Sequence, residues 1–526
     1  MARIGSSSIG VALALASVSC GSGVADQRSN AGAGGGVHAP CAEACVQGGS
    51  SSASGEAGEG GDAPSGASGG APLALGGVAI AEVSFWQALR VPLEQNGRAL
   101  EPNAPIIQNK EGIWRVYLRP DLGFEARSLS AVLELATGAN VQQLESKKLI
   151  RGASNDAQFS STFNFPIDAD RVLADTTYSL TLTDGPGGAV LDRFPSVGRQ
   201  PLGARAISPS NSLQVVVVPI TVGGVPPDVS APTLAAFRAR VRAMYPLAEV
   251  EITVHAPLVS GLSVGPEEGW DALLDAVYAL RAADQPAPNV FYYGLFTPTK
   301  TFAAYCVSDC TVGYSLIADV RSEEDRGSLG LGIFSDGSNG DAPDTMAHEL
   351  GHALGRDHAP CQTSDPGPFP YPGGKLGSWG FDPLRHLLLD PLIYGDVMGY
   401  CSPDWVSDFT YRALFKRLTL VNAEVSSAKS LLPSATPSAY LRVLLRSDGS
   451  LHWGSRFTPR HPPEGEVRAV TLLGVDGGEV GSVPARVRHL GDAAGGVLLL
   501  PESALDGRAG IAAIRVGNAV LALPTP

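Results

Sequence analysis

The residues best able to carry out chemistry lie in one stretch of sequence, HELGHALGRDH, which begins at His348. His348 and His352 are four positions apart, so on a helix they lie one turn above each other and can bind one ion together. Glu349 would lie beside that ion, where a carboxylate can hold a water molecule for attack. Gly355 can end the helix in a left-handed conformation, after which the chain can turn and bring His358 to the same ion. Three neutral imidazoles leave coordination positions open, which is typical of a catalytic zinc site.

The residues before the first histidine predict where this helix begins. The sequence DAPD, from Asp341 to Asp344, supplies a capping residue, a proline and an acidic residue in the order that helix starts favour. We therefore expect Asp341 to cap the helix that carries the motif.

The chain from about 212 to 425 alternates between strand and helix patterns. A run of β-branched residues, LQVVVVPIT, predicts a buried strand, and TLAAFRARVRAMYP then has the apolar spacing of a helix. Strand, helix and strand patterns follow in EVEITVHAPL, GWDALLDAVYALRAAD and NVFYYGLF. This order predicts an α/β domain in which helical crossovers cover a mixed, mostly parallel sheet.

The histidine motif and a later methionine together resemble the metzincins, a clan of zinc endopeptidases. Metzincins combine HExxHxxGxxH with a methionine-containing turn below the metal, and here YGDVMGY places Met398 about 40 residues after His358. The resemblance covers roughly residues 212–425, where the strand–helix order and the later amphipathic segment WVSDFTYRALFKRL also fit. It implies that Met398 packs beneath the imidazoles as an apolar support without binding the ion.

Tyr400 follows this methionine by two residues, as in the astacin and serralysin branches of the clan. In those branches the tyrosine can approach the zinc and then hydrogen-bond to the transition state. An ordinary packed aromatic is the other interpretation, and the sequence leaves both open, as it does the metzincin branch. A secreted bacterial group that includes enzymes cleaving mucins and other glycoproteins also pairs this motif with flanking β domains.

The resemblance implies a zinc-dependent endopeptidase that hydrolyses peptide bonds in proteins or glycoproteins. One zinc ion would activate water, Glu349 would act as general base and acid, and Tyr400 would support the oxyanion. A surface-tethered binding protein with an inactive zinc domain is the alternative, although this chain keeps the glutamate and all three histidines. A gluzincin, with a downstream glutamate in place of His358, is disfavoured by the methionine turn.

Four cysteines lie in the segment around the proposed site. Cys361 and Cys401 flank that site, so a disulfide between them would join the third-ligand loop to the methionine turn. Cys306 and Cys310 would then close a tight loop before the strand GYSLIAD, which is a candidate for the sheet edge along which an extended peptide lies. Six cysteines nevertheless allow 15 pairings, and sequence does not decide among them.

Other residues in this part of the chain favour structural roles. Asp336, Asn339 and Asp341 could suggest calcium, but the segment lacks the full spacing of a calcium loop and a turn with a cap explains it. Asp357 could orient the loop or hydrogen-bond to the third ligand. The remaining histidines are expected on the surface or in the core: His255, His386, His452, His461 and His489.

The first twenty residues predict export. One arginine precedes an apolar stretch from Ile9 to Val18, about half the roughly 20 residues that a membrane-spanning helix needs. The ending SVSC resembles a bacterial lipobox, in which Cys20 would be lipidated, although Ser17 stands where the family usually has leucine. Cleavage by an ordinary signal peptidase is the alternative. The protein is therefore expected at the outer membrane or cell surface through a lipid anchor, or otherwise secreted.

Composition separates the remaining regions. Residues 21–77 are rich in glycine and serine and predict a flexible linker in which Cys41 and Cys45 form a small local disulfide. Alternating apolar runs and turn residues predict β-sandwich-like domains on both sides of the catalytic domain. These are an accessory or pro-domain over 78–205 and a small β domain over 432–526.

Charge and cysteine usage limit the partners. The 526-residue chain has a net charge of −14 and lacks a basic stripe that could neutralise phosphates, so nucleic acid is not expected to bind. Six cysteines besides Cys20 suit an oxidising compartment. The expected partner is a protein or glycoprotein substrate; the oligomeric state stays open.

Overall fold

The computed structural model describes residues 77–308, 310–319, 321–338, 341–363, 366–428, 438–491, 495–505 and 510–524. The predicted signal peptide, the predicted linker up to residue 76 and Cys20, Cys41 and Cys45 lie outside these described residues. None of the helices in the described ranges is both long enough and apolar enough to cross a bilayer.

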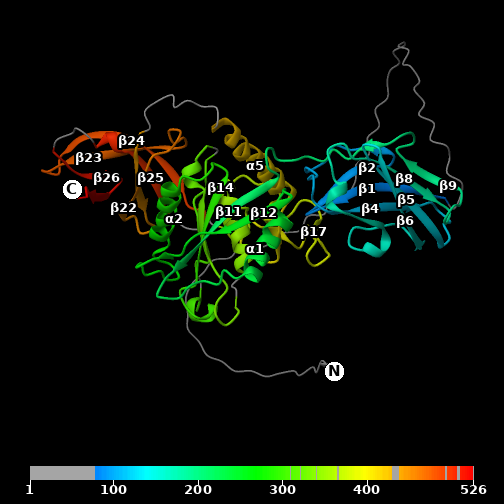
Figure 1. Ribbon diagram of the computed structural model, residues 1–526, viewed down its shortest axis with the longest axis horizontal. Helices are drawn as coiled ribbons and strands as arrows, with labels where there is room; N and C mark the ends of the chain where they lie inside the picture. The colour runs from blue at the N-terminus through cyan, green and yellow to red at the C-terminus, as the bar shows by residue number, and fades with distance from the viewer. Residues whose placement is uncertain are drawn as a thin grey trace, which may run out of the picture. The chain divides into compact units, whose positions relative to one another are not determined.

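The first described region consists of two antiparallel sheets, drawn in blue and cyan in Figure 1. One has the order β3 (Arg98–Ala99), β2 (Arg90–Gln95), β1 (Val78–Trp86), β4 (Gly112–Pro120) and β7 (Phe163–Ile167). The other has the order β10 (Gln200–Pro201), β8 (Thr177–Thr183), β5 (Arg127–Thr137) and β6 (Asn140–Ile150), with β9 (Val190–Phe194) on β8. Short 3-10 turns η1 (Phe159–Ser161) and η2 (Ala169–Arg171) connect them.

These two sheets pack face to face through aromatic side chains. The ring of Trp114, on β4, lies 5.2 Å from that of Phe85 in the same sheet and 4.6 Å from that of Tyr178 in the other sheet. All three are buried, because alternate residues of each strand point into the layer between the sheets. The region is therefore a two-layer antiparallel sandwich.

The central region is built on a mixed sheet with one antiparallel edge strand. Its order is β12 (Glu249–Val254), β11 (Ser212–Thr221), β14 (Val290–Phe296), β16 (Gly327–Leu331) and β15 (Gly313–Ser315), with β13 (Leu258–Val259) also on β11. Every pair in it is parallel except β15 with β16. The strand GYSLIAD thus contributes β15, which lies at the end of this strand order.

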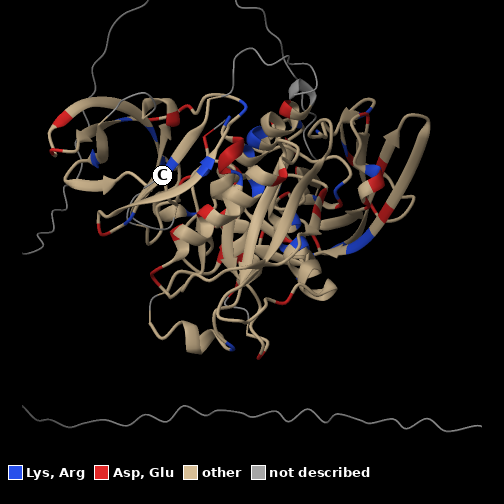
Figure 2. Cartoon of the chain, turned by 60° about the vertical axis from the view of Figure 1, so that its left-hand side comes forward, with Lys and Arg blue, Asp and Glu red and all other residues tan. Residues whose placement is uncertain are grey.

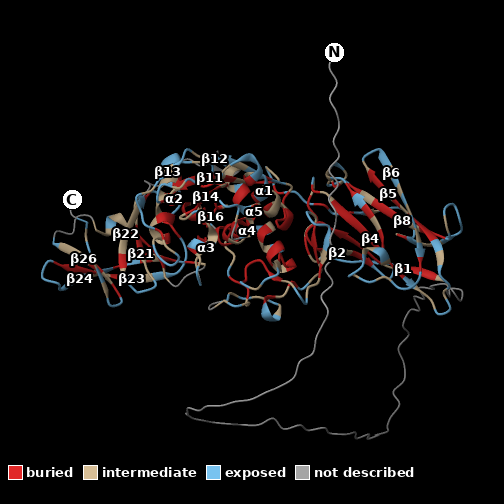
Figure 3. Ribbon diagram, turned by 90° about the horizontal axis from the view of Figure 1, so that it is seen from below, coloured by how far each residue is buried: buried red, intermediate tan, exposed pale blue. Residues whose placement is uncertain are grey.

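Helices cover both faces of this sheet. In β11, Val215 and Val217 belong to one core with α1 (Ala231–Met244), α4 (Ala342–Ala353) and α5 (Asp408–Ala428), whereas Val218 and Ile220 belong to another with α2 (Trp270–Asp284). Because successive side chains point to opposite faces, a strand covered on both sides is apolar throughout. Figure 3 shows the resulting buried band through the sheet and α4.

Short elements connect α2, α4 and α5. They are α3 (Phe302–Tyr305), η3 (Glu323–Asp325), η4 (Pro372–Gly374), β17 (Gly380–Asp382), β18 (Leu387–Leu389), β19 (Gly395–Asp396) and β20 (Asp404–Trp405). β17 pairs with β18 and β19 pairs with β20, so the long connection after α4 is built from two small sheets.

The C-terminal region is one antiparallel sheet, which differs from the sandwich-like domain expected there. Its order is β22 (Leu451–Phe457), β21 (Tyr440–Leu445), β25 (Gly496–Pro501), β24 (Glu479–His489), β23 (Val467–Gly474), β26 (Ile511–Val516) and β27 (Ala519–Ala522), with η5 (Glu502–Ala504) after β25. The two end strands approach each other, since Trp453 Nε1 donates to the Ala522 carbonyl at 2.7 Å. A sheet that curls back in this way encloses its own apolar core without a second layer.

A buried lysine joins the sandwich to the central region. Lys110 Nζ donates to the carbonyls of Arg242 and Tyr245 at 2.7 Å each, at the C-terminal end of α1. The next residue, Glu111, accepts two hydrogen bonds from Arg242 at 2.6 and 2.5 Å. Burial lowers the pKa of Lys110 to about 7, with Arg242 adding to this effect and Glu111 opposing it.

Replacing this lysine should change how stability depends on pH. Because the pKa of Lys110 is about 7 when folded, the unfolded chain binds more protons between pH 7 and its unfolded pKa of about 10.4. The contribution of the amine to stability therefore rises with pH across that interval and is lost as pH falls through 7. Relative to Lys110→Met, the free energy of unfolding of the wild-type protein should rise by up to about 1.4 kcal/mol per pH unit across this interval.

Thermal unfolding of both proteins between pH 7 and 10 measures this difference. Lys147→Met, at an exposed position, is the matched control and should give a difference that does not change with pH. A pH-independent difference for Lys110→Met would contradict the assignment.

Candidate metal centre

The helix α4 carries two of the three histidines and the glutamate. Asp341 occupies the predicted N-cap position with φ = 58°, but its side chain makes no capping hydrogen bond. The acidic residue of the first turn, Asp344, instead bonds to Arg240 of α1. The Asp344 carboxylate at the start of the helix therefore forms a tertiary ion pair. The proline and the acidic residue predicted for the first turn are both present.

The three predicted imidazole ligands converge. His352 Nε2 lies 3.0 Å from His348 Nε2 and 3.2 Å from His358 Nε2. In the described part of the chain, these three form the one group of histidine, cysteine or acidic side chains placed to hold an ion. Nitrogen ligands about 2.0–2.1 Å from a tetrahedral zinc ion lie roughly 3.4 Å apart, so the donor set fits zinc.

Backbone carbonyls orient two of the rings. Nδ1 of His348 lies 2.7 Å from the Val397 carbonyl, and Nδ1 of His352 lies 2.7 Å from the Arg356 carbonyl. Because a carbonyl accepts a hydrogen bond only from a protonated nitrogen, the proton of each ring is on Nδ1 and the Nε2 lone pair is left for the metal.

The turn at Gly355 places both the third ligand and one of these carbonyls. Gly355 has φ = 74°, its amide donates to the His352 carbonyl at 2.7 Å, and the Arg356 amide donates to the Gly351 carbonyl at 2.9 Å. These two bonds are those of a Schellman motif. A side chain at this position would also lie 2.7 Å from the Ala318 carbonyl. The glycine is therefore required by both the conformation and the space.

Met398 is buried and packs against α4. Its sulfur fills the space beside Gly351, so a side chain at 351 would overlap with it. Its carbonyl accepts from the Ala359 amide at 2.9 Å, which ties the methionine turn to the residue after the third ligand.

Asp396 holds this turn in place, and the sequence analysis did not identify it. One carboxylate oxygen accepts from the Met398 amide and the other from the Ser407 amide, each at 2.9 Å. Burial raises the pKa of Asp396, while hydrogen bonds from Ser407, Met398 and Thr410 oppose that shift. Its position two residues before the methionine is the signal that could have pointed to it.

Tyr400 lies at the surface of the site. Its ring centroid is 4.8 Å from that of His358 and 5.9 Å from that of His348, and the residue is 45% exposed. The predicted disulfide Cys361–Cys401 is present and joins the loop after His358 to the residue after Tyr400. Cys306 and Cys310 form the second one.

Glu349 lies between α4 and the edge strand β15. It is 2% exposed and lines a cleft of about 660 Å³ together with His348 and Tyr400. A side chain at Gly313 of β15 would overlap with the Glu349 carboxylate. Sequence analysis also missed this glycine and Gly351, because only the folded neighbours reveal that they need space.

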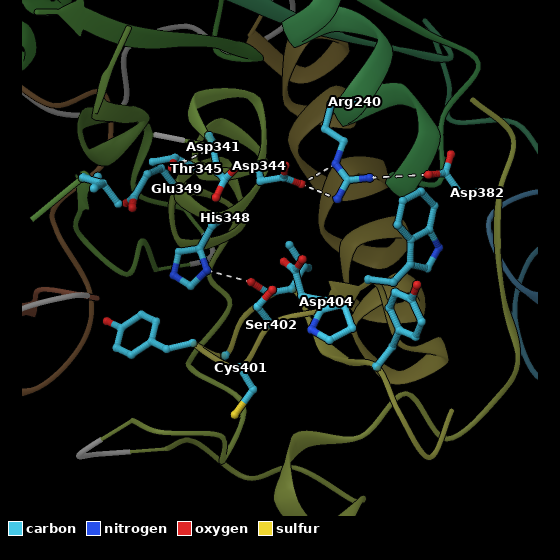
Figure 4. Close-up of a pocket in the computed structure, with 18 of the residues that line it drawn as sticks. Arg240, Asp341, Asp344, Thr345, His348, Glu349, Asp382, Cys401, Ser402 and Asp404 are labelled. Carbon is cyan, nitrogen blue, oxygen red and sulfur yellow. Dashed lines mark hydrogen bonds and ion pairs between the residues drawn. The ribbon is translucent and has the colours of Figure 1, made fainter. Parts of the chain in front are cut away.

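Acidic residues predominate in the cleft beside His348 (Figure 4). Arg240 bonds to Asp344, lies 3.9 Å from Asp382 and stacks over Trp405 at 4.8 Å. Burial raises the pKa of the nearby Asp404 to about 6, with Asp344 adding to the shift and Arg240 and His348 opposing it. Elsewhere Lys and Arg are interspersed with Asp and Glu along the elements (Figure 2).

The residues that the sequence analysis set aside do not join the cluster. Asp336 accepts from the Ser338 amide at 3.0 Å, as in an ordinary turn, while Asn339 lies outside the described residues. Asp357 is exposed. His255 pairs with Asp284, His386 stacks on Phe159, His452 lies beside Ser450 and His489 beside Glu466, away from the metal cluster; His461 is exposed.

Comparison with known proteins supports a peptidase. Residues 315–403, which contain the three histidines, Glu349, Met398 and Tyr400, match the family described as Peptidase M66. No curated protein matches the chain. Together, the family match and the imidazole cluster support a metallopeptidase.

Among solved structures, the similarities are weak. A chain described as "Structure of a chaperone-substrate complex" is 12% identical with a TM-score of 0.25, over 50% of this chain and 39% of that one. Metalloproteinase-II from Bacteroides fragilis is 14% identical with a TM-score of 0.19, over 48% of this chain and 83% of that one. The chain thus spans about two fifths of the first of these, and likeness at this level does not bear on function.

Substituting Gly355 should damage both stability and metal binding. Gly355→Ala should destabilise the fold by about 1–3 kcal/mol, because a residue with a Cβ is strained at this φ, and should weaken zinc affinity about tenfold or more, because the Arg356 carbonyl shifts. Thermal unfolding and competition with a chelator measure the two effects.

Gly203→Ala is the matched control, because Gly203 has a similar φ of 72° with nothing within 4 Å of an added side chain. This variant should be less stable than wild type but should keep the wild-type zinc affinity. Equal zinc affinity in the two variants would show that this turn does not set the ligand geometry.

Proposed function

We propose that the protein is an exported zinc-dependent endopeptidase of the metzincin type, which cleaves proteins or glycoproteins. The observation that carries this proposal is the convergence of three Nε2 atoms beside a buried glutamate in an open cleft. The antiparallel edge strand β15 and the buried Met398, packed against α4, support the metzincin type. The two disulfides support an oxidising location, in keeping with secretion or a lipid anchor at Cys20.

The ligand set would be His348, His352 and His358. When bound, zinc supplies Lewis acidity, which lowers the pKa of water towards about 7 and polarises a carbonyl group. The chain's own contribution to metal binding is to hold three neutral imidazoles with their Nε2 atoms facing one point.

Glu349 is placed to move the proton during hydrolysis. Its carboxylate lines the cleft next to His348, so it can accept a proton from the attacking water and pass it to the leaving amine. Tyr400, whose ring lies beside those of His348 and His358, can donate its hydroxyl proton in a hydrogen bond to the oxyanion. These two side chains would act only in catalysis, because neither is among the three ligands.

The edge strand can hold an extended substrate. The Leu331 amide of β16 donates to the Val312 carbonyl at 2.9 Å, so by alternation the peptide groups of Gly313 face away from the sheet. A substrate backbone lying along Gly313 would pass the cleft that contains Glu349.

Removing the glutamate should separate metal binding from catalysis. Glu349→Ala should keep one zinc per chain but lose peptide cleavage by a factor of about 10²–10⁴ or more, because the proton acceptor is gone. Zinc content after dialysis and cleavage of a peptide library measure the two properties. Retained turnover by this variant would refute the role of Glu349.

Tyr400→Phe is the companion variant. It should lower kcat by up to about 10²–10³ with little change in KM, because the hydroxyl is needed only for the oxyanion. Wild-type kcat would assign Tyr400 a packing role.

If wild-type protein digests nothing, with or without chelator, the chain is instead the binding protein with an inactive zinc domain.

A further inference from the structure

The C-terminal sheet extends into the metal centre. Where β15 ends, the chain continues alongside the end of β24: Leu316 and Leu490 form an antiparallel bridge. The Gly491 amide donates to the Ser315 carbonyl at 2.9 Å, and the Ile317 amide donates to the His489 carbonyl at 3.0 Å. A segment some 170 residues later in sequence therefore pairs with the chain at the end of β15, from Ser315 to Ile317.

This pairing places Gly491 against the ring of His352. A Cβ at Gly491 would lie 2.5 Å from both Cδ2 and Nε2 of His352 and 2.8 Å from Cε1. These distances are far below the contact distance of about 3.5–4.0 Å for carbon atoms. Only a glycine fits there without moving the imidazole. The ring atoms that it approaches include Nε2, the proposed metal ligand.

The segment is held firmly enough to act on the ring. Just before it, the buried Arg488 donates to Asp325 Oδ2 at 2.5 Å and to Ser322 Oγ at 2.6 Å, both in the central region. Leu490 and Leu316 are buried in one apolar core shared by the two regions. The backbone at Gly491 therefore has a fixed position relative to the helix that carries His352.

Two of its contacts restrict the orientation of the His352 ring. The Arg356 carbonyl accepts a hydrogen bond from Nδ1, but this bond alone does not fix the tilt of the ring. Gly491 covers the ring face near Nε2 and so limits that tilt. We propose that Gly491, supplied by the C-terminal β domain, is a positioning residue for the metal ligand His352. The C-terminal domain is then part of the metal centre and not merely an accessory domain. This proposal rests on the proposed zinc site.

The test compares Gly491→Ala with wild type in the full-length protein. The added methyl group forces the ring or the segment to move, so zinc affinity, measured by competition with a chelator, should fall about 10–100-fold. With cobalt(II) in place of zinc, the visible absorption bands should shift, because they report the coordination geometry. kcat should fall along with metal affinity.

Gly261→Ala is the matched control, because Gly261 is exposed and has nothing within 4 Å of an added methyl group. It should keep the zinc affinity and the cobalt spectrum of wild type. Thermal unfolding of the metal-free proteins shows whether Gly491→Ala still folds. Wild-type affinity and spectrum in Gly491→Ala would overturn the proposal.

A second measurement needs no variant. Coupling between two sites is reciprocal, so if Gly491 positions His352, zinc must in turn stabilise the Gly491 segment. Hydrogen exchange of the Gly491 and Ile317 amides in wild-type protein should slow when zinc is added. Protection confined to α4 would overturn the proposal. If wild-type protein bound no zinc at all, the proposed function itself would fail.

Discussion

The site depends on the orientation of three imidazole rings whose Nε2 lone pairs face one another. Nε2 of His352 lies 3.0 Å from that of His348 and 3.2 Å from that of His358, close enough for one cation to be bound by all three. The Val397 and Arg356 carbonyls enforce this arrangement, because each accepts the Nδ1 proton of one ring. The surrounding structure can be understood as the support for these two carbonyls and for the chain that returns with His358.

That support comes from segments that are distant in sequence. The Schellman turn at Gly355 positions the Arg356 carbonyl, and Asp396 holds the methionine turn that presents the Val397 carbonyl. The Cys361–Cys401 disulfide links the two loops that carry these groups. The edge strand β15 lies close enough to Glu349 that only glycine fits at position 313. The three histidines and the Glu349 carboxylate are therefore held by one connected framework.

Sequence predicted what local geometry determines. Helical spacing predicted which face His348 and His352 share, and a glycine at the helix end predicted the turn. Requirements set by tertiary neighbours were missed, as for Gly351 beneath Met398 and Gly491 beside His352. The helix start at Asp341 was predicted, but no sequence pattern links Asp344 of its first turn to Arg240, about 100 residues earlier. The C-terminal domain was expected to be sandwich-like, but it is a single curled sheet. Alternation of apolar residues predicts strands but not whether the end strands meet.

The central claim is that three imidazole nitrogens bind a single zinc ion. Anomalous diffraction at the zinc absorption edge, from crystals grown with zinc, tests it most directly. The account predicts one strong peak, about 2.0–2.1 Å from Nε2 of His348, His352 and His358, with Glu349 nearby but not bound. A zinc peak held by a downstream glutamate in place of His358, or the absence of any peak among the three rings, would contradict it.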